Sequence, residues 1–302
     1  MRRAGGFGPP PLLPAVYFAG LDLFSPFTAE DIASTMTPPN IKQVLLASAA
    51  VICLSAPVMA GTFNDAEIVQ MGIANSSIQF QDGYSNTAAT LQFGAYNDSE
   101  IIQIAYHNDA DLMQAGYGNT AAIHQGGTWN DAVIAQVGGS NDAFIDQVGG
   151  GLEASAVQLG WANDVTVVQA GLMDDANIFQ AGTYNDVMIA QVGYGHDVAV
   201  VQVGTGNKAD ASQSGADHEA TILQAGLGND AYLRQSGTKN SAAVAQAGKD
   251  NTATVQQAGF RNDATTIQVG RGNSATQTQG GAFNAATIVQ VGRSNTAVQT
   301  QR

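Results

Sequence analysis

The residues best suited to chemistry in this sequence are two histidines and one aspartate that follow one another at a fixed spacing. Asp174, His196 and His218 are separated by steps of 22 residues. If the chain returns to the same place every 22 residues, the carboxylate and the two imidazoles lie on neighbouring turns. Such a group could bind a transition metal or change its charge near neutral pH. The alternative is that the three residues only loosen a structural column locally.

A second set of ionisable side chains follows the same spacing. Its members are Asp109, Asp131, Glu153, Asp175, Asp197 and Glu219. On strands about 4.8 Å apart they would form one column of like charges. Neighbouring carboxylates at that distance repel by roughly 1 kcal/mol in water, and more where water is excluded. The column is therefore either a solvated face or a repulsive device that protons or divalent cations neutralise.

Amide side chains are still more regular than the ionisable ones. Counting from Asn64 in steps of eleven, the seventh residue is Gln in all twenty-two units and the first is Asn in eighteen. The ninth is Gly in twenty of the twenty-one units that reach it, and Ala105 is the exception. The four units without the Asn follow one another at the 22-residue step: Leu152, Asp174, His196 and His218. Self-similarity at a fixed period predicts a repeat architecture.

The elements that position these side chains follow from the pattern inside one unit, of which 130–140 is an example. Positions one, three, five and seven carry Asn, a small residue, an aliphatic residue and Gln. Alternation over seven residues is the period of a β-strand, so these positions share one face. Positions eight to eleven have the composition of a turn. We predict an all-β protein, a cross-β solenoid in which two strand-turn units make one 22-residue rung and about eleven rungs stack.

Stacking must supply the stability of such a solenoid, because one rung buries too little to offset the entropy of ordering it. Inward amides then form ladders, each donating to one neighbouring rung and accepting from the other. We expect these ladders to contain Gln70, Gln81, Gln92, Gln136, Gln191, Gln246, Gln290 and Gln301, together with Asn64, Asn75, Asn130, Asn185 and Asn295.

A right-handed coiled coil is the competing interpretation, because it also has an eleven-residue period. It would place a glycine in every third turn of helix, at a cost of about 1 kcal/mol each. The strand interpretation has no such conflict and is preferred.

The first 60 residues lie outside the repeats. We interpret 1–35 as disordered or as the product of an upstream start codon. Residues 36–60 have the features of a secretory signal peptide: Lys42, an apolar run from Val44 to Leu54, and small residues before a cleavage site after Ala60. The run is too short for a membrane anchor. The mature chain would then be 61–302, entirely repeats, with neither end of the array capped.

Composition narrows the range of functions. The net charge is −14 and only 12% of residues are charged, so nucleic acid is not an expected partner. From 61 to 206 there are sixteen acidic and no basic residues, whereas 207–302 has six acids and eight bases. Opposite ends of that kind favour head-to-tail stacking of copies. The only cysteine is Cys53, and no catalytic or phosphate-binding motif occurs. We expect neither an enzyme nor a cofactor, and no membrane span in the mature chain.

The pattern N-x-A-x-x-x-Q-x-G-x-x-N, repeated from Asn64 to Arg302, resembles the curlin repeat of curli subunits. Curli are extracellular functional amyloid fibres of bacterial biofilms. The resemblance implies a secreted protein that passes an outer-membrane pore, polymerises at the bacterial surface with the help of a fibre nucleator, and serves adhesion and biofilm cohesion. Curli subunits have a Gly- and Asn-rich segment before the first repeat, where this sequence has only Gly61, Thr62 and Phe63.

The resemblance leaves several roles open. The chain could be a major subunit or a nucleator, and an alternative from another class is a monomeric surface solenoid that acts as an adhesin or binding module. For a polymer, the carboxylate column becomes a gatekeeper, and fibre growth should accelerate between neutral pH and pH 4. Aromatic residues at turn positions ten and eleven either pack within the turns or line an edge that contacts fibres or matrix polysaccharide; they include Tyr84, Tyr106, Trp129, Trp161, Tyr184 and Phe283.

Overall fold

The computed structural model describes residues 17–18, 21–22 and 58–302. The interpretations of 1–35 as disordered and of 36–60 as a signal peptide therefore fall almost wholly outside the described residues. Strands β1 (Tyr17–Phe18) and β2 (Leu21–Asp22) pair antiparallel. They belong to a different unit from the repeats, which lie within the compact unit 49–302.

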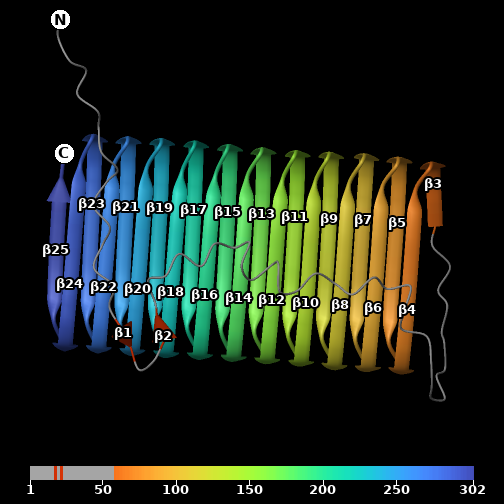
Figure 1. Ribbon diagram of the computed structural model, residues 1–302, viewed down its shortest axis with the longest axis horizontal. Helices are drawn as coiled ribbons and strands as arrows, with labels where there is room; N and C mark the ends of the chain where they lie inside the picture. The colour runs from red at the N-terminus through yellow and green to blue at the C-terminus, as the bar shows by residue number, and fades with distance from the viewer. Residues whose placement is uncertain (1–16, 19–20, 23–57) are drawn as a thin grey trace, which may run out of the picture. The chain divides into compact units, whose positions relative to one another are not determined.

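Together, the repeats form a parallel β-solenoid, as predicted (Figure 1). Its strands are β3 (Val58–Thr62), β4 (Asp65–Ile73), β5 (Ser76–Tyr84), β6 (Thr87–Ala95), β7 (Asp98–Tyr106), β8 (Asp109–Tyr117), β9 (Thr120–Thr128), β10 (Asp131–Gly139), β11 (Asp142–Gly150), β12 (Glu153–Trp161), β13 (Asp164–Leu172), β14 (Asp175–Thr183), β15 (Asp186–Tyr194), β16 (Asp197–Thr205), β17 (Lys208–Ala216), β18 (Glu219–Leu227), β19 (Asp230–Thr238), β20 (Ser241–Lys249), β21 (Thr252–Phe260), β22 (Asp263–Arg271), β23 (Ser274–Ala282), β24 (Ala285–Arg293) and β25 (Thr296–Gln301).

The strands divide into two sheets. The even-numbered strands β4 to β24 form an 11-stranded sheet, here called the even sheet, and β3 to β25 form a 12-stranded odd sheet. Each strand pairs in parallel with the strand one rung away, so Gln136 lies beside Gln158 and Asp131 beside Glu153. The 22-residue step inferred from the sequence is therefore the register of both sheets.

The core lies between the two sheets and consists of the regular positions. In β10, Ala132, Ile134 and Gln136 are each 0% exposed, whereas the residues between them face outward. Alternation of side chains along a strand produces this pattern. The hydrophobic cluster repeats it along the stack, mainly with small and β-branched residues. The core is thus narrow, and about half of its side chains are amides.

Strand boundaries differ from the sequence-based prediction. We expected strands over positions one to seven and turns over positions eight to eleven, but the strands occupy positions two to ten. The bend is confined to position eleven, which has positive φ, as at Ser140 (φ 54°), and to the following Asn. The position-nine glycines also have positive φ but remain in the ladder. A solenoid can bend sharply in this way because rung-to-rung hydrogen bonds continue through the bend.

The ends of the stack have strands that are paired on one side. β24 pairs only with β22, and β25 only with β23. At the other end, β4 pairs with β6, and β5 pairs with β7 and also with the short β3. β3 begins at Val58, so three residues assigned to the predicted leader take part in the odd sheet.

Candidate functional site

The glutamine ladders run through the core of both sheets. Gln136 Nε2 donates to Gln158 Oε1 at 2.8 Å and to the Thr120 carbonyl of the opposite sheet at 2.9 Å. Each ladder therefore joins neighbouring rungs and also the two sheets. The even sheet holds Gln70, Gln92, Gln136, Gln246 and Gln290 of the predicted set, and the odd sheet holds Gln81, Gln191 and Gln301.

The asparagine side chains stabilise the bends through hydrogen bonds to the backbone. Asn75 Oδ1 accepts the backbone N–H of Asn97 in the next rung at 3.1 Å. Its Nδ2 donates to the carbonyls of Met71 and Gly94, each at 3.3 Å. Asn75, Asn185 and Asn295 lie in the uninterrupted column, and Asn64 and Asn130 lie in the one that the four other residues interrupt. The role of these amides is to satisfy backbone groups that the bend removes from the sheets.

The two histidines of the interrupted column take over the hydrogen bonds of asparagine. Nδ1 of His196 accepts the N–H of His218 at 3.4 Å, and Nδ1 of His218 accepts the N–H of Asn240 at 3.2 Å. Their Nε2 atoms lie 3.2 and 3.0 Å from the carbonyls of Val192 and Ser214. The rings stack with centroids 5.0 Å apart. Each imidazole therefore presents one acceptor and one donor where an amide would.

This geometry leaves no ring nitrogen of the pair free for a ligand. The structure does place Asp174, His196 and His218 on successive rungs, as the spacing indicates. Within residues 58–302, however, no group of three or more His, Cys, Asp or Glu side chains is arranged to hold a metal ion. Burial lowers the pKa of His218, and a proton on Nδ1 would break the hydrogen bond from Asn240. The arrangement favours the structural interpretation of this column.

Asp174, in the same column, has a buried side chain that is not fully hydrogen-bonded. Its Oδ1 accepts the N–H of His196 at 2.9 Å, but its buried Oδ2 has no partner. In asparagine the corresponding atom is a donor that faces backbone carbonyls. Burial raises the pKa of Asp174, because a charged carboxylate here loses water and gains only one hydrogen bond.

Asp174→Asn is expected to stabilise the solenoid by about 1–3 kcal/mol at neutral pH, because a donor replaces an unpaired buried oxygen. The gain should shrink as pH falls, since a raised folded-state pKa means that protonation relieves the wild-type penalty. Thermal unfolding at several pH values measures this, with the exposed Asp98→Asn as the control. Equal effects of the two substitutions would contradict the assignment.

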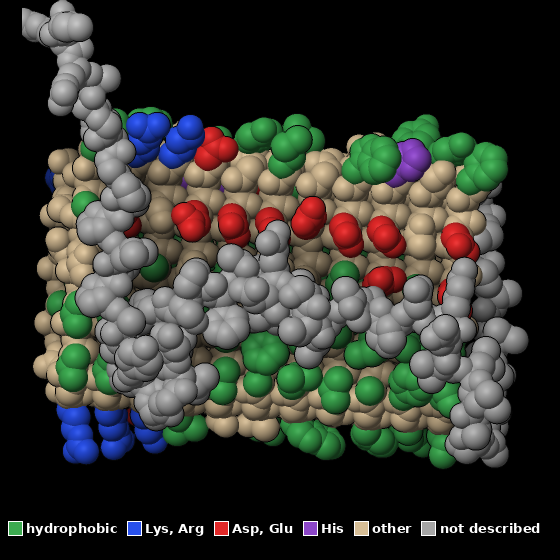
Figure 2. Space-filling model, viewed as in Figure 1, with side chains coloured by type: hydrophobic (Ala, Val, Ile, Leu, Met, Phe, Trp, Pro, Cys, Tyr) green, Lys and Arg blue, Asp and Glu red, His purple; other side chains and the backbone are tan. Residues whose placement is uncertain are grey.

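The carboxylate column lies on the outer face of the even sheet. Parallel pairing places Asp109, Asp131, Glu153, Asp175, Asp197 and Glu219 side by side on successive strands. Figure 2 shows them as a row of acidic side chains across one face. The pKa of Asp175 is raised to about 7, first by partial loss of water and then by repulsion from Asp197 and Glu153. The pKa of Asp131 is raised to about 6, first by partial loss of water and then by repulsion from Asp109, Glu153 and Asp111, although its side chain remains exposed and partly screened.

Lowering the pH from about 8 to 4 is expected to raise the melting temperature of the solenoid. The folded-state pKa of Asp175 lies above its ordinary value, so the charged form destabilises the fold and protonation removes that penalty. Asp175→Asn should reduce this dependence measurably. Asp263→Asn should not, because Asp263 has the same position in the even sheet but lies between Ser241 and Ala285. A melting temperature that falls on acidification in this range would contradict the expectation.

Aromatic and basic side chains gather at the two bends rather than at one edge. The odd-to-even edge, where odd strands lead into even ones, carries Phe63, Tyr84, His107 and Trp129 at one end, with Phe63 and Tyr84 5.2 Å apart and His107 stacked on Trp129 at 4.2 Å. At its other end Phe260 and Phe283 are 5.4 Å apart, and Arg261 lies over Phe260.

Trp161 and Tyr184 lie on the opposite edge, the even-to-odd edge. Lys249, Arg271 and Arg293 follow one another there. Basic side chains gather near the C-terminal end of both edges in Figure 2.

The sequence interpretation missed this division into two edges. The signal was available in the 22-residue step, because Tyr84, Tyr106 and Trp129 come from one set of bends and Trp161 and Tyr184 from the other. It also missed that histidine can replace asparagine in the ladder.

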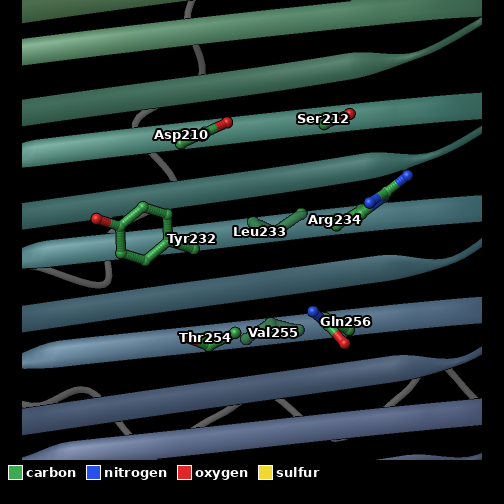
Figure 3. Close-up of a pocket in the computed structure, with 8 residues that line it drawn as sticks. All are labelled: Asp210, Ser212, Tyr232, Leu233, Arg234, Thr254, Val255 and Gln256. Atoms are coloured by element: carbon green, nitrogen blue, oxygen red, sulfur yellow. The ribbon is translucent and has the colours of Figure 1, made fainter.

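An open depression occurs on the outer face of the odd sheet. It lies between two columns of outward side chains, Asp210, Tyr232 and Thr254 in one and Ser212, Arg234 and Gln256 in the other (Figure 3). The columns come from three successive strands, β17, β19 and β21. Among the described residues of this depression, no hydrogen bond joins a nucleophilic side chain to a base. The described residues also contain no helix that could cross a membrane.

Parallel rungs, two amide ladders and one-sided end strands define a tandem-repeat β-solenoid. The family model described as the curlin associated repeat matches residues 107–138, 119–149, 138–171, 197–226, 204–237 and 228–259. The chain belongs to the curlin-repeat family, and the family and its β-solenoid fold are structural rather than enzymatic. No curated protein matches the chain.

Proposed function

We propose that this chain is a secreted subunit that self-assembles into extracellular curli-like fibres, which provide adhesion and biofilm matrix. The observation that carries the proposal is the identical pairing of successive rungs, in which each strand extends its sheet through the same backbone register and glutamine ladder. β24 and β25 each have one unpaired edge, and their side chains repeat the ladder positions of every interior rung. A second copy that docks there extends both sheets without any change of fold.

The unpaired edge is chemically ready for such pairing. The N–H of Asp263 donates to the Asn284 carbonyl one rung later. Alternate residues of a strand point the same way, so Ala285 and Thr287 direct their N–H groups away from the stack. A flat edge of this kind is a template for another chain. Membership of the curlin-repeat family supports the same conclusion.

Purified 61–302 tests the proposal. Every strand from β4 to β25 has a pairing partner within this polypeptide, and the repeats lie within one compact unit. Fibres that bind amyloid dyes and form in a concentration-dependent, seedable reaction are expected. A polypeptide that remains a discrete particle at every concentration would overturn the proposal and favour the monomeric adhesin or binding module instead.

Proline at the free edge is expected to stop elongation while leaving the solenoid folded. The double variant Thr287→Pro with Val298→Pro removes outward N–H groups from β24 and β25 and places a ring where the next copy must pair. Seeded growth should slow at least about tenfold, since two hydrogen bonds of roughly 1 kcal/mol each are lost. Thr287→Val with Val298→Thr retains the donors and serves as the control. Unchanged growth of the proline variant, with an unchanged circular dichroism spectrum, would show that this edge is not used.

A further inference from the structure

Two registers are possible where one copy meets the next. The repeat is eleven residues, but a rung is twenty-two, so a copy can dock with Asn64 following either Asn284 or Asn295. We call the first the full-rung register and the second the half-rung register; they differ by half a turn about the stack axis. Glutamine and asparagine occupy the same positions in both. The residue pattern of the repeat alone therefore does not choose between them.

We propose that copies of the polypeptide 61–302 join in the full-rung register, in which β24 pairs with β4 and β25 with β5 of the next copy. This inference rests on the proposed fibre function. It names the residues that form the joint: Phe283, Val298, Gln301 and Arg302 on one copy, and Phe63, Ile78, Gln81 and Asp82 on the other.

Outward side chains match in only one register. In the full-rung register Val298 lies beside Ile78, and Arg302 beside Asp82, each one rung step apart. Val298 is 72% and Ile78 58% exposed in the single copy, so the contact removes apolar surface from water. In the half-rung register Val298 would lie beside Glu67, and Arg302 beside Met71. That arrangement places an apolar side chain beside a carboxylate and a guanidinium beside a thioether.

An acceptor without a partner at the first rung points to the same register. In the interior, each glutamine Oε1 accepts from the preceding rung, as Gln103 Oε1 does from Gln81 at 2.8 Å. With β3 paired along the edge of β5, Gln81 is 1% exposed, and its own Oε1 has no partner. Gln301, whose Nε2 donates to the Ala285 carbonyl, is the residue that precedes Gln81 in the full-rung register. In the half-rung register Gln301 would precede Gln70, and the Gln81 acceptor would stay unpaired.

The odd-to-even edge adds an aromatic contact at the joint. Phe283 and Phe63 are 69% and 73% exposed at opposite ends of that edge. In the full-rung register they follow each other at the same step as Phe260 and Phe283, whose rings are 5.4 Å apart. In the half-rung register Phe63 would follow Ser294. The full-rung register thus joins the two aromatic groups of this edge into one.

Strand β3 occupies the edge of β5 at which this joint would form. Its residues 58–60 pair with Phe80, Gln81 and Asp82 of β5, the positions that residues 300–302 of the preceding copy would occupy. Gly61 and Thr62 pair with Gly83 and Tyr84 and do not conflict. Cleavage after Ala60, as the sequence predicts, would remove the conflicting residues and leave the others in place. Processing of the leader would therefore also expose the docking edge.

Cysteine pairs distinguish the registers, because Cys53 is the only natural cysteine and lies outside 61–302. Val298→Cys with Ile78→Cys should form intermolecular disulfides in oxidised fibres, giving a ladder of covalent oligomers. Val298→Cys with Glu67→Cys should not. Within one copy both pairs are about 48 Å apart, at roughly 4.8 Å per rung, so internal bonds are not formed. Fibres in which the second pair cross-links, or neither does, would overturn the register but not the fibre function. Absence of fibres from the parent 61–302 would overturn both.

A charge exchange provides an independent measurement on folded protein. Arg302→Glu should slow seeded elongation by about threefold or more through repulsion from Asp82, and adding Asp82→Arg in the same chain should restore it. Both side chains are exposed, so the fold should not change. For β3, the polypeptide 58–302 should elongate more slowly than 61–302 and lose the cross-link between positions 78 and 298. Failure of the second charge to rescue the first would contradict the Arg302 contact, and equal behaviour of the two polypeptides would contradict the block by β3.

Discussion

Replacing Gln257 with leucine is expected to lower the free energy of unfolding by about 3–5 kcal/mol, whereas the same replacement at Gln256 should change it by less than about 0.5 kcal/mol. Gln257 is 2% exposed, and its Nε2 donates to Gln279 Oε1 and to the Ser241 carbonyl, each at 2.8 Å. It also accepts from Gln235 at 2.8 Å. Leucine has nearly the same volume but leaves the groups on both neighbouring rungs without their partner.

The adjacent Gln256 is a matched control. It faces outward from the same strand and is exposed. Both substitutions exchange the same side chains, so any difference in melting temperature reports the ladder and not helix or strand propensity. Because each rung contacts only its neighbours, the loss should appear as local opening near β21, measurable by hydrogen exchange. Similar effects at both positions would show that the ladders contribute little.

The repeat period carries most of the information about the fold. The spacing of Gln70 to Gln301 predicted parallel pairing at a step of 22, and the structure has that register in both sheets. The alternation of Asn, Ala and Gln predicted which side chains are buried. These predictions depend only on periodicity, and one break in the period would have displaced every later column.

The details of the bend could not be derived in the same way. Glycine is common in turns, so position nine was assigned to the turn, but its backbone remains in the ladder. The residue that bends the chain is position eleven, where Trp129, Ser140 and Met173 all have positive φ. Because residues of different types occupy position eleven, the sequence does not reveal that this position needs a positive φ. The left-handed conformation is imposed by the flanking hydrogen bonds rather than by residue type.

The candidate site was predicted in part. Spacing alone placed Asp174, His196 and His218 in one column. It could not show that both ring nitrogens of each histidine contact backbone atoms, because the direction of a side chain depends on the bend. The carboxylate column was likewise located from the sequence, but repulsion was expected as the main cause of its raised pKa values. Loss of water is the larger cause at Asp131 and Asp175.

Gly182→Ala is expected to lower the free energy of unfolding by about 2–4 kcal/mol, because the new Cβ meets backbone and not open space. At Gly182, φ is +129°, and an added Cβ would lie 1.9 Å from the carbonyl oxygen of Gly204 in the next rung. That oxygen belongs to the sheet and cannot move without disturbing the neighbouring strand.

Two further substitutions separate steric contact from backbone conformation. Gly206 also has positive φ, +66°, but an added Cβ meets nothing within 4 Å. Alanine already occupies the same position in other units, as Ala74 and Ala162, so Gly206→Ala should cost no more than about 1 kcal/mol. Ala105, with φ 92°, is the one non-glycine at position nine, and Ala105→Gly should raise stability by about 1 kcal/mol by relieving its strain. Thermal unfolding of the three variants should therefore give a large loss, a small loss and a gain. If Gly182→Ala and Gly206→Ala lose equally, the positive φ and not the close approach of rungs explains why position nine is glycine.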